Sequence, residues 1–367
     1  MAKIERIEVA YVDLKPKVTR TDAIQAFVSQ QTPIVTITDT DGARGTGYTY
    51  TIGTGGTAVL AHLADDLLPV LKGMDAARVE AIWRSLKYHS HATTPGAMTA
   101  LALSAIDTAL WDLRAKRAGL PLWQLAGGAR DKIPLYTTEG GWLHIETAAL
   151  VDDAVAAQAK GFRGAKVKVG KPHPGEDVAR LEAVRRGVGQ GFEIFTDANQ
   201  AFRVDEAIRR ARLLEPLDIG WLEEPLLSDD VAGHERLSAS TTLPIAVGES
   251  IYSASWFREY MARGACSVVQ VDVARIGGIT PWLKVAHTAE AFNMAVCPHF
   301  LMELHVSLCC AVPNARWLEY IPQLDTITAE AMSIVDGNGV PSDAPGLGIS
   351  WDWEAIHAQR AADNVII

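Results

Sequence analysis

The sequence predicts an α/β protein in which a closed parallel β-barrel follows a smaller α+β module. From Ile133 onward, eight short apolar runs alternate with amphipathic helical segments, which is the order expected of barrel strands and their helices. Before Ile133, strand-like alternation gives way to helical periodicity, which indicates a separate α+β unit. A doubly wound sheet is the alternative, but the Gly-rich phosphate-binding turn expected after its first strand is missing.

The N-terminal module is expected to span about residues 1–127. Residues 4–14 and 33–51 alternate apolar and polar side chains as strands do, and Asp41-Gly42 marks a hairpin turn between two of them. Helical patterns follow at about residues 57–71, 76–88 and 96–118. The last pattern stops at Gly119, with a proline just beyond, which is a common end of a helix.

The barrel domain is expected over residues 128–321, after the Gly127-Gly128 turn. Its strand candidates, in chain order, are IPLYTT, GAKVKVG, EIFTD, IGWLE, PIAVGE, SVVQVD, MAVCPH and RWLEY. The tail, residues 322–367, contains the turn signal DAPGLG and no further strand-helix repeat. We therefore expect the tail to pack back on the N-terminal module.

The composition is typical of a well-packed enzyme, with 48% apolar and 21% charged residues among 367. The formal net charge of -10 argues against nucleic acid or an anionic membrane as a partner. No run approaches the roughly 18 apolar residues of a membrane helix, and the charged N-terminus does not resemble a secretory signal. The four cysteines show no CxxC spacing, so we expect buried, reduced thiols and a cytoplasmic location.

Three carboxylates end three successive strand candidates, and each of Asp197, Glu223 and Glu249 is separated from the next by 26 residues. The carboxyl ends of barrel strands line the active-site mouth, so we expect these acids to meet there. They would repel one another strongly without a cation between them, and a site made only of oxygen atoms favours a hard cation. The sequence therefore predicts a Mg²⁺ site and a carboxylate-containing small molecule as the substrate.

Two neighbours of these acids also bear on the site. Glu224 follows Glu223 directly, and strand alternation puts these two side chains on opposite faces, with Glu223 on the face of Trp221. Glu223 is therefore the predicted ligand. Asn199 lies two residues beyond Asp197 and shares its direction, so it is a candidate for holding the substrate carboxylate. Capping of the next helix is the alternative interpretation of Asn199.

Lys166 and Lys168 are two residues apart in the second strand candidate, so both side chains face the same way, into the barrel. Charge buried in this way is costly unless partners or function justify it. An exposed edge strand with solvated lysines is the alternative. We expect the neighbouring ammonium group to lower the pKa of Lys168, so that this lysine can act as a base.

Asp272 and His299 end the sixth and seventh strand candidates, which are neighbours in the barrel. A carboxylate beside an imidazole fixes its tautomer and raises its basicity, so His299 is predicted to be a second general base. Glu319 ends the eighth strand, where we expect it to donate or organise a hydrogen bond to a developing enolate oxygen. A salt-bridge role is the alternative for Glu319. Lys168 and His299 would then approach the α-carbon of the substrate from different sides.

These residues resemble those of the enolase superfamily, in its mandelate racemase subgroup. The resemblance runs nearly end to end, and its specific parts are the KVK segment at 166–168, the three acids, the Asp272-His299 pair, Glu319 and the DAPGLG tail. It implies a (β/α)₇β barrel with an α+β cap whose loops close over the substrate, Mg²⁺ as the cofactor, and a Lys or His base. Members of the superfamily are commonly homo-oligomers, so we expect one here.

Within the subgroup, the segments GGWLH, PHFLMELH and WLEEPLL are similar to talarate/galactarate dehydratases, which implies loss of water from an acid sugar. A racemase or epimerase of an α-hydroxy acid is the alternative, because mandelate racemase shares the catalytic set. A non-catalytic binding barrel is the alternative from another class, and it is disfavoured because no catalytic position is substituted.

The candidate lid over the site, residues 17–33, carries many polar side chains, which suits a polyhydroxy acid. Within it, Arg20 is the candidate partner for the far carboxylate of a diacid. A surface-facing arginine is the alternative interpretation.

Overall fold

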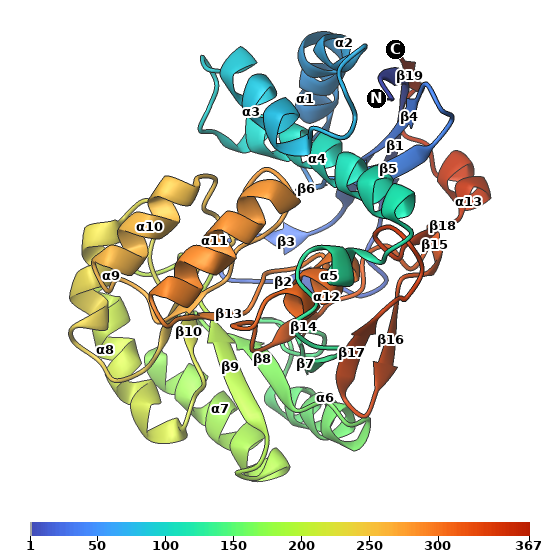
Figure 1. Cartoon of the computed structure of the whole chain (residues 1–367). Coiled ribbons are helices and arrows are strands. Elements are labelled where there is room, and N and C mark those ends of the chain that lie inside the picture. The colour runs from blue at the N-terminus through green and yellow to red at the C-terminus, as the bar shows by residue number, and fades with distance from the viewer. Residues whose placement is uncertain (1) are drawn as a thin grey trace.

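The computed structural model describes residues 2–367, in which a cap lies over a barrel domain (Figure 1). The cap contains an antiparallel sheet of order β19-β1-β4-β5, with β6 paired to β4. Its strands are β1 (Ile4–Leu14), β4 (Gln30–Asp39), β5 (Arg44–Tyr48), β6 (Thr51–Ile52) and β19 (Val365–Ile366). The predicted hairpin turn at Asp41-Gly42 is confirmed between β4 and β5, where Gly42 adopts a φ of 81°.

The cap helices follow the predicted patterns closely. They are α1 (Gly56–Ala61), a π-helical turn (His62–Leu67), α2 (Leu68–Leu71), α3 (Val79–His89), α4 (Ala97–Ala118) and α5 (Leu122–Leu125). The end of α4 at Gly119 is confirmed, with the left-handed φ of 67° that glycine adopts freely. Gly47 lets α4 lie directly on the cap sheet, because a Cβ there would be 2.2 Å from the backbone nitrogen of Ala109.

All eight predicted barrel strands are present in the predicted order. They are β7 (Ile133–Thr137), β8 (Gly164–Lys168), β9 (Glu193–Asp197), β10 (Leu222–Glu223), β11 (Ile245–Val247), β12 (Val268–Val269), β13 (Ala295–Val296) and β14 (Leu318–Tyr320). Strands β7 to β13 are joined in sequence by parallel pairing, and β14 pairs in parallel with β7. Between β13 and the chain before β14 the contact is a single parallel bridge, Val296–Ala315, so closure of the ring stays a prediction.

Helices between the strands cover the outside of this sheet (Figure 1). They are α6 (Thr147–Ala159), α7 (Pro174–Val188), α8 (Val204–Leu214) with a 3₁₀ turn (Glu215–Leu217), α9 (Val231–Ser238), α10 (Ala254–Ala262), α11 (Ile279–Ala291) and α12 (Met302–Ala311). The tail adds β15 (Thr328–Glu330), β16 (Met332–Val335), β17 (Asn338–Pro341), β18 (Ser350–Trp351) and α13 (Trp353–Ala358). The β16-β17 hairpin pairs with β7, whereas β19 returns to the cap sheet, so the tail contacts both parts.

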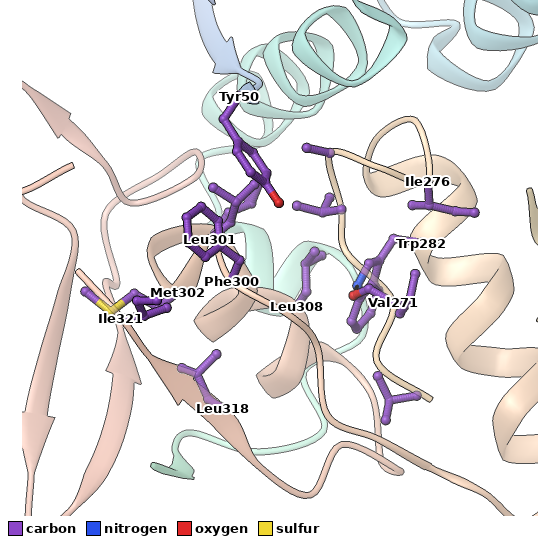
Figure 2. Packing of buried hydrophobic residues seen from close by; sticks show 14 of the residues in the cluster. Tyr50, Val271, Ile276, Trp282, Phe300, Leu301, Met302, Leu308, Leu318 and Ile321 are labelled. Carbon is purple, nitrogen blue, oxygen red and sulfur yellow. Dashed lines mark hydrogen bonds between the residues drawn. The ribbon is translucent and has the colours of Figure 1, made fainter. Parts of the chain in front are cut away.

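The parallel strands of the barrel domain carry a compact apolar cluster that forms a floor below the polar strand ends. Its members are Tyr136, Phe195, Trp221, Ala246, Val268, Cys297 and Trp317. Phe195 and Trp221 stack at a centroid distance of 3.7 Å. A second, larger core joins the cap to the barrel, and Figure 2 shows Tyr50 of the cap beside Phe300 and Leu301 of the barrel. The floor supports the site from below, and the larger core fixes the cap against it.

Two expectations from composition concern the rest of the chain. Among residues 2–367, no helix combines the length and apolarity required to span a bilayer. The four cysteines, Cys266, Cys297, Cys309 and Cys310, are all free and buried, as the sequence predicted.

Candidate active site

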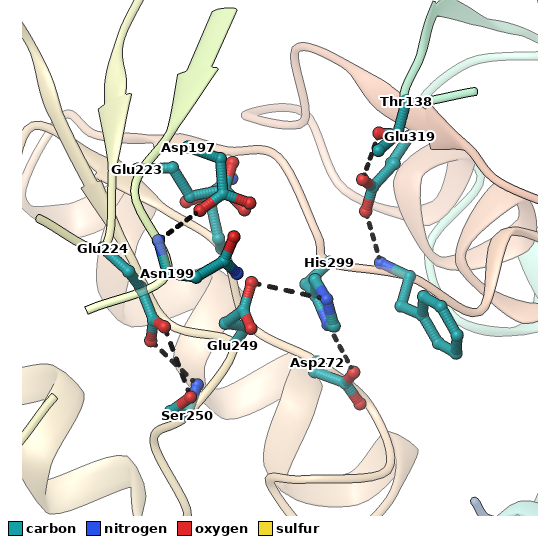
Figure 3. A network of polar contacts seen from close by, with 12 residues as sticks. Thr138, Asp197, Asn199, Glu223, Glu224, Glu249, Ser250, Asp272, His299 and Glu319 are labelled. Carbon is teal, nitrogen blue, oxygen red and sulfur yellow. Dashed lines mark hydrogen bonds and ion pairs between the residues drawn. The ribbon is translucent and has the colours of Figure 1, made fainter. Parts of the chain in front are cut away.

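Three adjacent parallel strands bring the predicted metal ligands together. Asp197 and Glu223 are the last residues of β9 and β10 and are direct partners in the ladder, and Glu249 lies two residues past β11. One oxygen of each carboxylate lies within 4.8 Å of the others, and all three residues are buried (Figure 3). The three acids therefore meet at the strand ends, as their spacing predicted.

The electrostatics of the cluster are those of a cation site. Burial, together with repulsion from Asp197, raises the pKa of Glu223 to about 8. Atom Oε2 of Glu249 is buried and accepts no hydrogen bond from residues 2–367, although His299 Nε2 lies 3.4 Å away, and a hard cation among the three carboxylates would provide the missing partner. The donor set contains only oxygen, so the residues present fit Mg²⁺.

Glu224 turns away from the cluster, as strand phase predicted. Its backbone has a φ of 36°, and its carboxylate accepts hydrogen bonds from the amide of Gln200 at 2.9 Å and from the backbone of Ser250 at 3.2 Å. Gln200 follows the β9 end and Ser250 follows Glu249, so Glu224 ties together the three loops that carry the ligands (Figure 3).

The two lysines of β8 are buried, which excludes the exposed-edge alternative. Nζ of Lys166 lies 2.8 Å from Glu223 Oε1 and 2.9 Å from Glu319 Oε1. Nζ of Lys168 lies 2.5 Å from Asp197 Oδ2 and 2.9 Å from Asn199 Oδ1. Asn199 thus orients Lys168, and it does not cap α8, whose N-cap is Arg203.

The expected lowering of the Lys168 pKa was wrong. Burial and the neighbouring Lys166 ammonium both lower it, but Asp197, assisted by other acids of the cluster, outweighs them and raises the pKa of Lys168 above its usual value. Conversely, although burial alone would raise the pKa of Asp197, Lys168 and Lys166 lower it. The surrounding carboxylates therefore outweigh the ammonium neighbour.

The predicted Asp272-His299 pair forms on the other side of the cluster, three residues past β12 and β13. His299 Nδ1 lies 2.9 Å from Asp272 Oδ2, and Nε2 lies 3.4 Å from Glu249 Oε2 (Figure 3). Burial lowers the pKa of His299, but Glu249 and Asp272 outweigh it, so the net shift is upward. Asp272 is held ionised because, against burial, the hydrogen bond from His299 lowers its pKa to about 2.

Both carboxylate oxygens of Glu319 already have partners. Its Oε1 accepts from Thr138 at 2.5 Å as well as contacting Lys166, and its Oε2 accepts from the backbone nitrogen of Phe300 at 2.8 Å. Burial would raise the pKa of Glu319, but Lys166 above all drives it far below its usual value. An ionised carboxylate cannot donate, so the salt-bridge interpretation describes these contacts, and a role toward an enolate stays a prediction.

Arg20 lies in the candidate lid, at the hairpin of β2 (Arg20–Thr21) and β3 (Ala26–Phe27), and is buried rather than surface-facing. Its guanidinium pairs with Glu139, donates to Gln323 at 3.0 Å and donates to the carbonyl of Pro322 at 3.1 Å. It borders a cavity of about 320 Å³ beside the barrel mouth. Arg20 therefore connects the lid to Glu139 of the barrel and to the start of the tail. Substrate binding by this residue stays a prediction.

Sequence reasoning missed several polar residues of the site. Gln270, which donates to Glu223 Oε2 at 2.7 Å, lies two residues before Asp272, so strand alternation pointed to it. Tyr50, from a cap loop, donates its hydroxyl to Asp272, and Arg275, from a barrel loop, donates its backbone nitrogen to Asp272 and its Nε to Tyr50. No pattern in the sequence indicated these two.

The fold and this site together define a class: capped barrel proteins with three acids at successive strand ends, a lysine pair and an Asp-His pair, which is the enolase superfamily. Family models agree, since residues 5–127 match the mandelate racemase / muconate lactonizing enzyme N-terminal domain. Residues 149–355 match the enolase C-terminal domain-like family. The chain belongs to the mandelate racemase / muconate lactonizing enzyme family of that superfamily.

Curated relatives are similar over most of the chain. A 3,6-anhydro-alpha-L-galactonate cycloisomerase of Streptomyces coelicolor is 40% identical, covering 88% of this chain and 89% of its own. An L-talarate/galactarate dehydratase of Salmonella typhimurium is 38% identical, covering 88% of this chain and 81% of its own. The crystal structure of that Salmonella dehydratase liganded with Mg and L-lyxarohydroxamate matches with a TM-score of 0.95 at 34% identity, covering 100% of this chain and 94% of that chain.

Proposed function

We propose that this protein is a Mg²⁺-dependent hydro-lyase that removes the α-proton of an acid sugar and expels its β-hydroxyl as water. The observation that carries the proposal is the placement of two potential bases at the two ends of one buried carboxylate cluster. Lys168 contacts Asp197 at one end, and His299 contacts Glu249 at the other. A carboxylate substrate on the cluster would present its α-carbon between them.

Asp197, Glu223 and Glu249 would hold the metal ion. When bound, Mg²⁺ stabilises the negative charge that develops on the substrate carboxylate and offsets the acids that keep the proton on Lys168. Side chains of the site would orient the two bases: Asn199 orients Lys168, and Asp272 orients His299.

Lys168 and His299 together would carry out the proton transfers of the reaction. Lys168 or His299 takes the α-proton, according to the configuration at that carbon, and the electron pair of the C–H bond moves toward the carboxylate. The pair then forms the Cα–Cβ double bond as the β-hydroxyl leaves, and a proton from the base on the other side converts it to water. The enol that remains becomes a 2-keto-3-deoxy acid.

An aldarate such as galactarate or talarate is the proposed substrate. The support is that the Salmonella relative named for these diacids matches this chain over its whole length in three dimensions. A second candidate rests on the cycloisomerase, which is 40% identical. The same residues acting on a sugar acid whose β-oxygen is part of a ring would open the ring and release no water.

The test is a semicarbazide assay of the Mg²⁺-loaded protein with galactarate, L-talarate, other aldarates, aldonates and 3,6-anhydro-galactonate. We expect keto-acid formation from one or both of the first two. Signal only from the anhydro acid would replace dehydration by ring opening. A blank panel, with α-proton exchange from mandelate or other hydroxy acids in D₂O, would assign racemisation instead.

Other expectations remain proposals of the same kind. These are a closed (β/α)₇β ring, domain limits at 1–127, 128–321 and 322–367, a homo-oligomer and a cytoplasmic location. The parallel bridge between Val296 and Ala315 supports closure, and gel filtration with light scattering would test the oligomer.

A further inference from the structure

The cap reaches the Asp272-His299 pair through one buried side chain. Tyr50 lies between β5 and β6, 222 residues from Asp272 in sequence, and is 1% exposed. Its hydroxyl donates to Asp272 Oδ2 at 2.7 Å, which is the oxygen that His299 Nδ1 contacts at 2.9 Å. The tyrosine and the imidazole therefore share one acceptor atom.

The direction of these hydrogen bonds is fixed by Arg275. Its Nε lies 3.1 Å from the Tyr50 oxygen, and a guanidinium can only donate. The Tyr50 hydroxyl must therefore accept from Arg275 and give its own proton to Asp272. The other carboxylate oxygen, Oδ1, accepts from the backbone nitrogens of Ala274 and Arg275 at 2.8 and 3.0 Å, which leaves His299 as the remaining partner of Oδ2.

Arg275 also connects this arrangement to the metal cluster. Its Nη1 donates to the backbone carbonyl of Glu249 at 2.9 Å, and the Glu249 side chain lies 3.4 Å from His299 Nε2. A closed polar circuit thus runs from Glu249 through Arg275, Tyr50, Asp272 and His299 back to Glu249. Within this circuit, Tyr50 is the member that comes from the cap.

Aromatic packing holds the Tyr50 ring independently of its hydroxyl. The ring lies 4.7 Å from that of Phe300, which in turn stacks on the His299 imidazole at 5.3 Å and 15°. Figure 2 shows Tyr50 pointing from the cap toward the Phe300 segment. Replacing Tyr50 by phenylalanine keeps these contacts and deletes one hydrogen-bond donor, so the variant isolates the hydroxyl.

We propose that Tyr50 is a positioning residue for His299: it fixes the Asp272 carboxylate, and through it the orientation of the imidazole, so that the cap tunes one of the two bases. The proposal rests on the proposed function, in which His299 is a base. None of the hydrogen bonds of Lys168 in residues 2–367 involves Tyr50. The effect should therefore be confined to one side of the substrate.

The test compares Tyr50→Phe with Tyr48→Phe in the Mg²⁺-loaded protein. Tyr48 is a matched control, because it is equally buried on the neighbouring strand and its hydroxyl has no hydrogen-bond partner within the described chain. Deuterium exchange is measured in D₂O for galactarate and L-talarate, which are epimers at one α-carbon, and it is followed at that carbon, where the two diacids present the hydrogen with opposite configurations. Whichever diacid loses exchange in His299→Asn reports on the histidine side.

We expect Tyr50→Phe to slow exchange of the histidine-side diacid about tenfold, as for loss of a hydrogen bond to a charged group, with its KM unchanged. The other diacid and the Tyr48→Phe control should keep wild-type rates. An equal loss for both diacids would mean a merely structural role and would overturn the proposal, as would an unchanged rate for both.

A second readout needs no substrate. The Nδ1–H proton of His299, assigned by its absence in His299→Asn, should shift or broaden in the NMR spectrum of Tyr50→Phe and stay in place in Tyr48→Phe. An unmoved resonance in Tyr50→Phe overturns the proposal. If wild-type protein acts on no diacid, the proposed function fails, and this spectrum still decides whether Tyr50 positions the imidazole.

Discussion

The two sides of the carboxylate cluster are built differently. The lysine side consists of Lys166, Lys168, Asn199 and Glu319, which all come from the barrel and contact one another or the cluster directly. The histidine side consists of Asp272, His299, Arg275 and Tyr50, and its contacts run from loops past the strand ends into the cap. The position of Lys168 is thus fixed by strand geometry, whereas that of His299 depends on how the cap meets the barrel domain.

The largest effects should separate the two sides. Lys168→Ala and His299→Asn should each slow α-proton exchange about a thousandfold for one diacid configuration, because each removes one general base. The affected configuration should differ between the two variants. Deuterium incorporation from D₂O into galactarate and L-talarate measures this difference. Loss on the same side in both variants would show that the two residues form one catalytic unit.

Glu249 contacts the histidine side and belongs to the metal cluster, so its replacement should affect proton exchange on both sides. Glu249→Gln removes a charged oxygen ligand and should weaken Mg²⁺ binding by at least about tenfold, measured by calorimetry, and slow exchange on both sides. Glu224→Gln is the matched control, since this neighbouring acid is buried outside the cluster. Loss of metal affinity in Glu224→Gln with none in Glu249→Gln would mean that Glu224 rather than Glu249 carries the third ligand position.

The same contrast explains what the sequence could predict. Alternation along β8 and the even spacing of strand ends are local regularities, so Lys166, Lys168 and the three acids follow from a period of two and a repeated strand-helix unit. The pair of Tyr50 and Asp272 spans 222 residues, and its geometry depends on how the cap docks, which no local pattern records. The predicted direction of the Lys168 pKa shift was wrong for a related reason, because that pKa depends on charges from four strands together.

The lid contacts the barrel near the lysine side, and a smaller effect should define its role. Arg20→Ala breaks the pairing with Glu139 and Gln323, so the lid should close less often and KM should rise about tenfold, as for loss of a charged hydrogen bond. Because the guanidinium already has these partners, we expect the same rise for aldarates and aldonates. A rise confined to the diacids would establish Arg20 as the partner of the far carboxylate.

The smallest effect concerns another contact between the cap and the barrel near the histidine side, between Asp107 and Thr280. Asp107 of α4 accepts hydrogen bonds from the backbone and hydroxyl of Thr280, at the start of α11, at 2.8 and 2.7 Å. Burial raises the pKa of Asp107 from 3.8 to about 7 in the folded protein, despite these donors. The folded state therefore holds this proton more tightly than the unfolded chain does.

The sign of the pH dependence follows from that difference. Below about pH 4 the Asp107 carboxyl is protonated in both states, so its contribution is fully present, and it is lost as the pH rises from about 4 through 7. In Asp107→Asn, the fall in unfolding free energy over this window should be shallower by about 1 kcal/mol per pH unit. Glu303, whose pKa burial also raises to about 7, leaves some slope in both proteins.

Urea denaturation of the Mg²⁺-loaded proteins at pH 5, 6 and 7 measures the difference. Equal pH dependence of the unfolding free energy in the two proteins would mean that the Asp107 carboxyl is already ionised at pH 5. The contact between Asp107 and Thr280 would then be an ordinary charged hydrogen bond.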